Sequence, residues 1–200
     1  MRTVAVRLDV ALRDDGKLLL PDNLSLDGSL YLGGDTSVTS LPDNLSIRGG
    51  LYLRESAIRS LPENLTVGGK LDLGGTAIRL LPKTLSVGGG LNLSRSAIRS
   101  LPASFTVGGF LNLSETPITA LPDCLTVGGP LDLRGSAIRS LPNNLVVGGY
   151  LDLSDTAIAS LPDDLIVGGG LWLSGTSIRS VPDGARIGGK VHWLPVPEPV

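Results

Sequence analysis

LPDNLSIRGGLYLRESAIRS occupies residues 41–60, and two close copies follow it, LPENLTVGGKLDLGGTAIRL at 61–80 and LPKTLSVGGGLNLSRSAIRS at 81–100. The same twenty-residue unit continues to the end of the chain, and a copy with one extra residue, in GGDTSVTS, begins at Leu20. A unit this short cannot bury its apolar residues alone and does so by stacking on its neighbours. The period therefore predicts a solenoid, in which each repeat forms one coil.

Glycine marks one corner of every repeat. The ninth position, counted from the leading Leu or Val, is always Gly, whereas the eighth becomes Asp27 and Arg48 in the first two copies. A position that accepts no side chain indicates a turn residue with a positive φ. A phosphate-binding loop is disfavoured, because it would be a single glycine loop leading into a helix. The ninth-position residues are Gly28, Gly49, Gly69, Gly89, Gly109, Gly129, Gly149, Gly169 and Gly189.

After the corner comes the pattern xLxL, which predicts the one dependable strand of each coil. In the repeat that begins at Leu141, alternation points Leu151 and Leu153 inward and Asp152 outward. The sixteenth position is Ser or Thr, and we expect its hydroxyl to bond backbone groups at a bend. Pro at the second position excludes a helix interior, because it fixes φ and has no N–H. We therefore expect a helix-free coil.

The run LxLxxTxIxxLPxxL, legible from Leu151 to Leu165, resembles the leucine-rich repeat, and its Leu-Pro dipeptide is similar to the LPX-type repeats of bacterial secreted effectors. Ser or Thr stands where that family prefers Asn or Cys. The resemblance implies a bacterial or phage origin and a parallel sheet whose outer face is the usual binding surface. A curved horseshoe and a straight β-helix both remain open, and we expect little curvature because no helix widens one side of the coil.

These features together predict an all-β fold, a single-chain right-handed β-solenoid with leucine-rich-repeat-like coils. We expect eight to nine coils over residues 20–190. Residues 1–19 predict an N-terminal β cap, because apolar and polar residues alternate along them. Residues 191–200 predict a Pro-rich C-terminal cap or tail, because Pro195, Pro197 and Pro199 cannot pair as a further strand.

The overall composition excludes several classes of partner and of location. The formal net charge is −2, so we expect neither nucleic acid nor a membrane surface as a partner. Cys124 is the single cysteine, and Arg7 and Asp9 interrupt the apolar residues near the N-terminus, so no classical signal peptide is indicated. We expect a cytoplasmic protein. A secreted effector without a classical signal peptide is the alternative that the resemblance implies.

The outward strand position differs from repeat to repeat, and we expect a binding surface there. Exposed aromatic side chains are the usual anchors of protein interfaces, and Trp172 beside Tyr150 is the favoured patch. The alternative is that the aromatic rings only cover the sheet or gaps at glycines. The candidate partner-binding residues are Tyr31, Tyr52, Phe110, Tyr150, Asp152 and Trp172.

A file of arginines forms a second candidate surface. Arg59, Arg79 and Arg99 share the nineteenth position, and Lys83 lies between the last two in sequence. Acidic residues at the third position, four residues further on, predict mutual neutralisation. The alternative is an anionic partner that binds Arg59, Arg79, Lys83 and Arg99.

The sequence carries few residues suited to chemistry. With one His and one Cys there is no nucleophile-base pair and no metal-ligand spacing. Asp72, Asp132 and Asp152 share the outward strand position, where a solvated face is favoured over a cation site. We predict a non-enzymatic scaffold without a cofactor that acts as a monomer and binds a protein. A structural or self-assembling spacer is the alternative.

Overall fold

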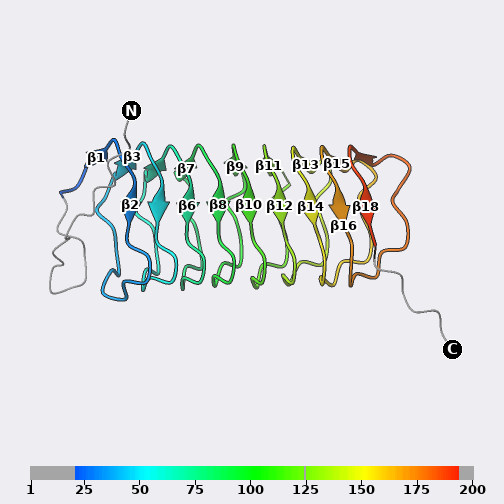
Figure 1. Cartoon of the computed structure of the whole chain (residues 1–200), viewed down its shortest axis with the longest axis horizontal. Helices are drawn as coiled ribbons and strands as arrows, with labels where there is room; N and C mark the ends of the chain where they lie inside the picture. Colours follow the sequence, from blue (N-terminus) through cyan, green and yellow to red (C-terminus); the bar gives the residue numbers. More distant parts are fainter. Residues whose placement is uncertain (1–20, 124, 194–200) are drawn as a thin grey trace.

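The computed structural model describes residues 21–123 and 125–193 of the 200-residue chain. These residues contain eighteen strands of two residues each and no helix, as the sequence predicts. Figure 1 shows the coils side by side along one long axis, so the chain is a parallel β-solenoid. The predicted N-terminal cap, Cys124 and residues 194–200 of the predicted tail lie outside the described residues.

The leucines of xLxL form the front sheet, which has nine strands in parallel. Each strand ends at the outward position. The strands are β2 (Leu30–Tyr31), β4 (Leu51–Tyr52), β6 (Leu71–Asp72), β8 (Leu91–Asn92), β10 (Leu111–Asn112), β12 (Leu131–Asp132), β14 (Leu151–Asp152), β16 (Leu171–Trp172) and β18 (Val191–His192).

Each coil also has a second strand, which the sequence pattern did not predict. These strands cover the sixth and seventh positions, where Thr66 is exposed and Val67 is buried, and two residues are too few to show a period. They form back sheets of four and five strands. Their bounds are β1 (Ser25–Leu26), β3 (Ser46–Ile47), β5 (Thr66–Val67), β7 (Ser86–Val87), β9 (Thr106–Val107), β11 (Thr126–Val127), β13 (Val146–Val147), β15 (Ile166–Val167) and β17 (Arg186–Ile187).

The strand register follows the sequence repeat. Leu71 pairs with Leu91, twenty residues on, whereas Leu30 pairs with Leu51, twenty-one residues on. The extra residue in the first copy is therefore absorbed outside the strands. Residues that share a position in the repeat form files along the solenoid, as predicted.

The core is a narrow aliphatic interior to which each coil contributes six side chains. In the coil that begins at Leu61, all six are 8% exposed or less. Close packing of identical side chains from adjacent coils buries what one coil could not bury alone. The six are Leu61, Leu65, Val67, Leu71, Leu73 and Ile78.

The glycine corner corrects one prediction. The ninth-position glycines do not have a φ in the left-handed region, so the predicted positive φ is wrong. They are glycine because adjacent coils touch there, backbone against backbone. A Cβ on Gly89 would lie 2.7 Å from the carbonyl carbon and oxygen of Gly69, and Gly89 N–H donates to that oxygen at 3.1 Å. Positive φ values occur elsewhere, for example at Asn64 and Glu55.

Most of the described sixteenth-position hydroxyls bond to the backbone, as predicted, whereas the buried hydroxyl of Ser136 has no hydrogen-bond partner. Thr76 Oγ1 donates to the carbonyl oxygen of Leu73 at 2.7 Å, three residues earlier in its own coil, and this bond closes the bend after the strand. The same bond recurs at Ser56, Thr116, Thr156 and Thr176.

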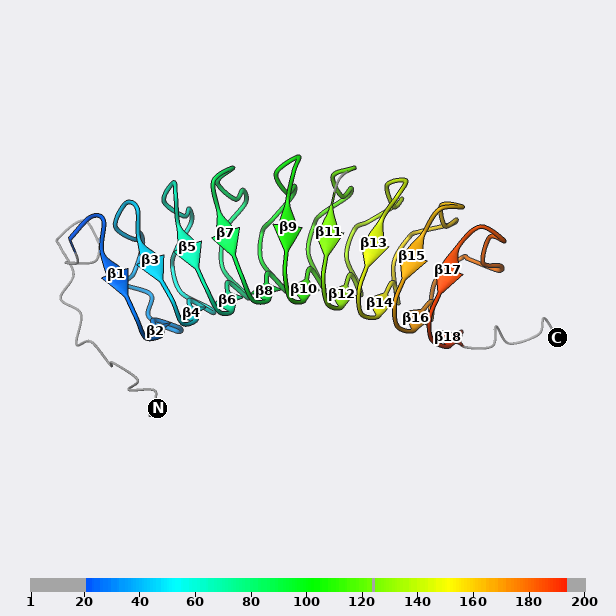
Figure 2. The ribbon, with the colours of Figure 1, turned by 90° about the horizontal axis from the view of Figure 1, so that it is seen from above.

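The stack is a shallow arc with the front sheet on its inner side (Figure 2). The back sheet is interrupted between β7 and β9, and Figure 2 shows a wider step there. Phe105 occupies the core slot that Leu fills in the other coils except the last, which has Ala185, and the larger ring holds these two coils apart. Leu85 and Val87 are accordingly 9% and 6% exposed, whereas Leu65 and Val67 are at 0%.

Candidate functional site

The inner side of the arc presents the outward residues of the front sheet together with the residue that precedes each strand. We call this surface the concave strand face. All six predicted partner-binding residues lie on it, because each is the second residue of a front strand or directly precedes one. They form two separate aromatic groups, with Phe110 between them along the chain.

The C-terminal group joins three rings from adjacent coils. Tyr150 and Trp172 meet edge to face with their ring centroids 5.2 Å apart. Trp172 also stacks on His192 at 4.7 Å with an interplanar angle of 15°. The structure therefore brings Trp172 and Tyr150 together as predicted, and it adds His192 to the group. Offset and edge-to-face pairs of this kind fix the rings in place.

The N-terminal group is a pair of tyrosines. Tyr31 and Tyr52 stack with their ring centroids 4.5 Å apart and 2° between the ring planes. Tyr31 is 55% exposed, the highest of the aromatic residues in the described part of the chain. Tyr52 lies six strands and Tyr31 seven strands away from Trp172 in the front sheet, so the predicted aromatic residues do not form one continuous patch.

Several of these rings also cover glycines. A Cβ on Gly50 would lie 2.7 Å from the ring of Tyr52, and one on Gly170 would lie 2.9 Å from the ring of Trp172. Phe110 leans over Gly90 in the same way. The covering of glycine gaps, which was the alternative explanation for these aromatics, therefore does occur at three positions.

Asp72 is a buried carboxylate with a complete set of partners. It accepts hydrogen bonds from Asn92 Nδ2 at 2.7 Å and from Gly74 N–H at 3.2 Å, and Lys70 Nζ lies 2.8 Å from its Oδ2. Burial works to raise the pKa of Asp72, but the bonds from Lys70, Gly74 and Asn92 outweigh it, and the pKa lies below its ordinary value. The sequence placed this carboxylate on a solvated face, which the structure does not bear out.

Asp132 occupies the same position three coils later in a different environment. Its carboxylate accepts a hydrogen bond from Arg134 N–H at 3.0 Å. Burial raises the pKa of Asp132, and the negative charges of Asp152 and Glu115 add to that effect. The side chain borders a hollow of about 330 Å³ between Phe110 and Tyr150, which sequence reasoning missed. The only signal for it is Pro130, the single proline among the residues that precede the front strands.

The candidate arginine surface is exposed but is not neutralised as predicted. Arg59, Arg79, Lys83 and Arg99 are all exposed. Arg99 N–H donates to the backbone oxygen of Arg79 at 3.3 Å, so these two arginines do lie at equivalent positions of adjacent coils. Within residues 21–123 and 125–193, no ion pair joins this file to the acidic third position. The predicted pairing assumed that residues four apart are neighbours, and that holds only in a helix.

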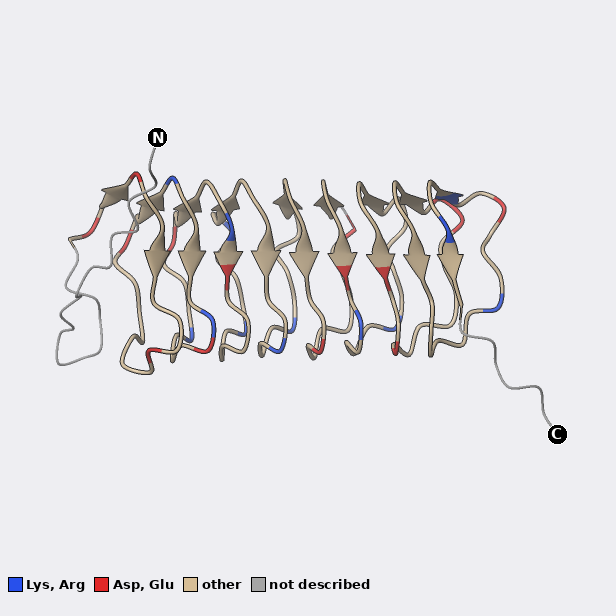
Figure 3. Cartoon of the chain, in the orientation of Figure 1, with Lys and Arg blue, Asp and Glu red and all other residues tan. Residues whose placement is uncertain are grey.

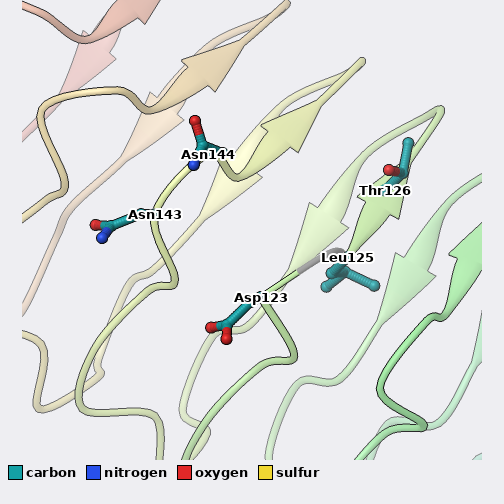
Figure 4. Close-up of a pocket in the computed structure, with 5 residues that line it drawn as sticks. All are labelled: Asp123, Leu125, Thr126, Asn143 and Asn144. Atoms are coloured by element: carbon teal, nitrogen blue, oxygen red, sulfur yellow. The ribbon is translucent and has the colours of Figure 1, made fainter.

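A second hollow, of about 510 Å³, lies at the turns that follow the Leu-Pro segments. Figure 4 shows that Asp123, Asn143 and Asn144 line it but point in different directions, so their polar atoms do not converge on one ligand. It also borders position 124, which is outside the described residues. We assign it no role.

The residues that the structure describes contain neither a candidate metal centre nor a candidate membrane-spanning helix. Among them, no group of three or more His, Cys, Asp or Glu side chains is arranged to hold a metal ion. No helix in this part of the chain is long and apolar enough to cross a membrane.

Comparison with known proteins adds little beyond the fold. No protein-family model matches the chain, and no curated protein sequence matches it. Among solved structures, the chain is similar to YopM from Yersinia enterocolitica WA-314, with 19% sequence identity and a TM-score of 0.37. The match covers 87% of this chain and 53% of YopM, so the chain spans about half the length of that protein. The description of this chain as a leucine-rich-repeat-like β-solenoid rests on its own period and strand register.

Proposed function

We propose that this chain is a non-enzymatic repeat scaffold that binds a protein partner through its concave strand face. The observation that supports this is the distribution of aromatic residues. The sequence has two Trp, three Tyr and two Phe, and five of them lie on this one face. Aromatic side chains offer large contact areas at a small cost in conformational entropy, and they dominate the binding energy of protein interfaces.

The aromatic group at Tyr150 and Trp172 provides the test. A partner captured from cells of the native organism is purified and titrated against the wild type and against the Tyr150→Ala, Trp172→Ala double variant. We expect binding to weaken by about 30-fold or more, because anchor residues contribute about 2 kcal/mol or more. Leu80→Ala is the matched control, since Leu80 is an exposed apolar residue, 65% accessible, away from the front sheet. Equal binding by the double variant and the wild type would refute the proposal.

The proposal takes the chain to act as a monomer without a cofactor. Sedimentation equilibrium over a wide concentration range tests this directly. A mass that stays at that of one chain supports a binding scaffold. Growth into higher species with concentration would favour the self-assembling spacer instead.

A second candidate function is favoured by the exposed arginine file. Arg59, Arg79 and Arg99 have no acidic partner in an ion pair among the residues that the structure describes. This arrangement suits an anionic partner that binds them together with Lys83. Reversal of these four charges to Glu should abolish such binding, and wild-type binding should weaken steeply with added salt. Binding that is independent of salt would exclude this candidate.

A further inference from the structure

The hollow on the concave strand face has an apolar wall and a polar part in its lining. Phe110 and Tyr150 stand on either side of it, and Pro130 lies between them. Asn112 and Asp132 supply the polar part of its lining. Its volume of about 330 Å³ is at the lower end of the range for small-ligand sites.

The same face already holds a lysine in a similar arrangement. Lys70 Nζ lies 2.8 Å from Oδ2 of Asp72. The same nitrogen lies 5.9 Å from the ring centroid of Tyr52 and 5.7 Å from that of Phe110. An ammonium group is thus held by a buried carboxylate and lies between two aromatic rings, where cation–π attraction adds to the ion pair.

The hollow repeats this arrangement without the ammonium. Lys70 and Pro130 each precede a front strand, and Asp72 and Asp132 each end that strand. Figure 3 shows a basic residue directly before β6 but none directly before β12 or β14. In residues 21–123 and 125–193, no ion pair joins Asp132 to a lysine or arginine. Proline stands where the cation stands beside Asp72, and Asp132 keeps only the hydrogen bond from Arg134 N–H and the more distant charge of Arg134.

The charges around the hollow favour a cation. Asp152 and Glu115 act on Asp132 with negative charge, and the opposing positive charge is that of Arg134. Burial raises the pKa of Tyr150, and the charges of Asp132 and Asp152 raise it further. The charges of Asp132 and Asp152 therefore act on Tyr150 as well as on each other. A negative, partly desolvated site is complementary to a single positive group.

We propose that this hollow binds the side chain of a lysine on the protein partner. The methylene stem packs against Phe110, Pro130 and Tyr150, because a lysine stem covers apolar surface while its charged end stays polar. The ammonium pairs with Asp132 and lies over the aromatic faces. This inference rests on the proposed function and deepens it, since it states which chemical group of the partner the concave strand face receives.

The test uses the whole chain and small probes that differ only in the end of the side chain. Nα-acetyl-lysine methylamide, its uncharged norleucine analogue and the corresponding arginine amide are titrated separately while amide NMR shifts are recorded. We expect saturable shifts at Asn112 and Asp132 with the lysine amide, and about tenfold weaker binding of the norleucine analogue. Equal binding of lysine and norleucine amides would overturn the proposal, as would tighter binding of the arginine amide.

Three variants test the comparison between the hollow at Asp132 and the ion pair of Lys70 with Asp72. Asp132→Asn removes the charge and should weaken binding of the lysine amide about tenfold. Pro130→Lys supplies the ammonium from within the chain and should abolish binding while lowering the pKa of Asp132, as Lys70 does for Asp72. Lys70→Ala should create a second binding site at Asp72. The position before a front strand carries Lys at Lys70 and Lys190, so Pro130→Lys is compatible with the fold. Unchanged binding in Pro130→Lys would refute the proposal.

The two proposals fail in different ways. Loss of partner binding in the Tyr150→Ala, Trp172→Ala variant, without any binding of the lysine amide, would leave the proposed function standing and remove this inference. Binding of the lysine amide at Asp132, together with a partner that ignores both aromatic substitutions, would remove the proposed function and leave a lysine-binding hollow that this partner does not use.

Discussion

The glycine corner and the concave strand face belong to the same coils, but they restrict the sequence in opposite ways. At the corner, adjacent backbones touch, and every repeat has the same residue. On the strand face, the residue before each strand can be Ser, Gly, Lys, Phe, Pro or Tyr, because its side chain leaves the stack. The glycine corner therefore maintains the stacking of the coils, whereas the position before each front strand can change its residue and acquire a function.

The largest effect is expected at the corner. Gly89→Ala places a Cβ 2.7 Å from backbone atoms of Gly69, which cannot move unless the coils separate. We expect the free energy of unfolding to fall by about 3 kcal/mol, at the upper end of overpacking costs. Urea denaturation followed by circular dichroism measures it.

Gly135→Ala is the control for that prediction. Gly135 has φ of +64° but open space around it, where an added Cβ would come no closer than 3.5 Å to Glu115. Only backbone strain of about 1 kcal/mol is expected. A corner variant no less stable than this control would show that contact between coils does not explain the repeated glycine.

A medium effect is expected at Asp72 on the strand face. Its pKa is lowered in the folded chain, so its charged form stabilises the fold above the pKa of the unfolded chain, and this contribution is lost as the pH falls through the folded value. Asp72→Asn should therefore cost about 1 kcal/mol at pH 7, because the ion pair with Lys70 is lost. Thermal melts at neutral and acidic pH should show the difference disappear in acid.

The smallest effect is expected at Asp132, with the opposite sign. Its pKa is raised, so its contribution to stability is full below the pKa of the unfolded chain and is lost as the pH rises through the folded value. Asp132→Asn should make the chain more stable at pH 7 by a few tenths of a kcal/mol. The same thermal melts measure it. A loss of stability at neutral pH would mean that Asp132 already has a cationic partner.

The alignment of equivalent residues in files along the solenoid could be predicted from the sequence, because in a stacked repeat the sequence period sets the register of the strands. The front strands, the core leucines and the Ser or Thr bonds such as Thr76 to Leu73 all followed from it. The conformation of the glycine corner did not, because a missing side chain has two physical causes, a positive φ and a close neighbour. A single sequence does not distinguish them.

The candidate site was predicted only in part, because its features depend on contacts between different coils. Trp172 and Tyr150 were identified from their position in the repeat and do meet. The ion pair of Lys70 and Asp72 and the hollow at Asp132 depend on how far each side chain leans toward the next coil. Composition and period contain no information about that lean.

The back sheet is divided into two parts at the coil that contains Phe105. The back sheet is interrupted at that coil, whereas the front sheet is continuous from β2 to β18. Bending the arc there breaks no back-sheet hydrogen bonds, because β7 and β9 are not paired. The front strands β8 and β10 are therefore the strand pair that joins the two parts of the stack at this point. The tyrosine pair and the Trp172 group lie on opposite sides of this junction, so a bend there would change the distance between the two aromatic groups.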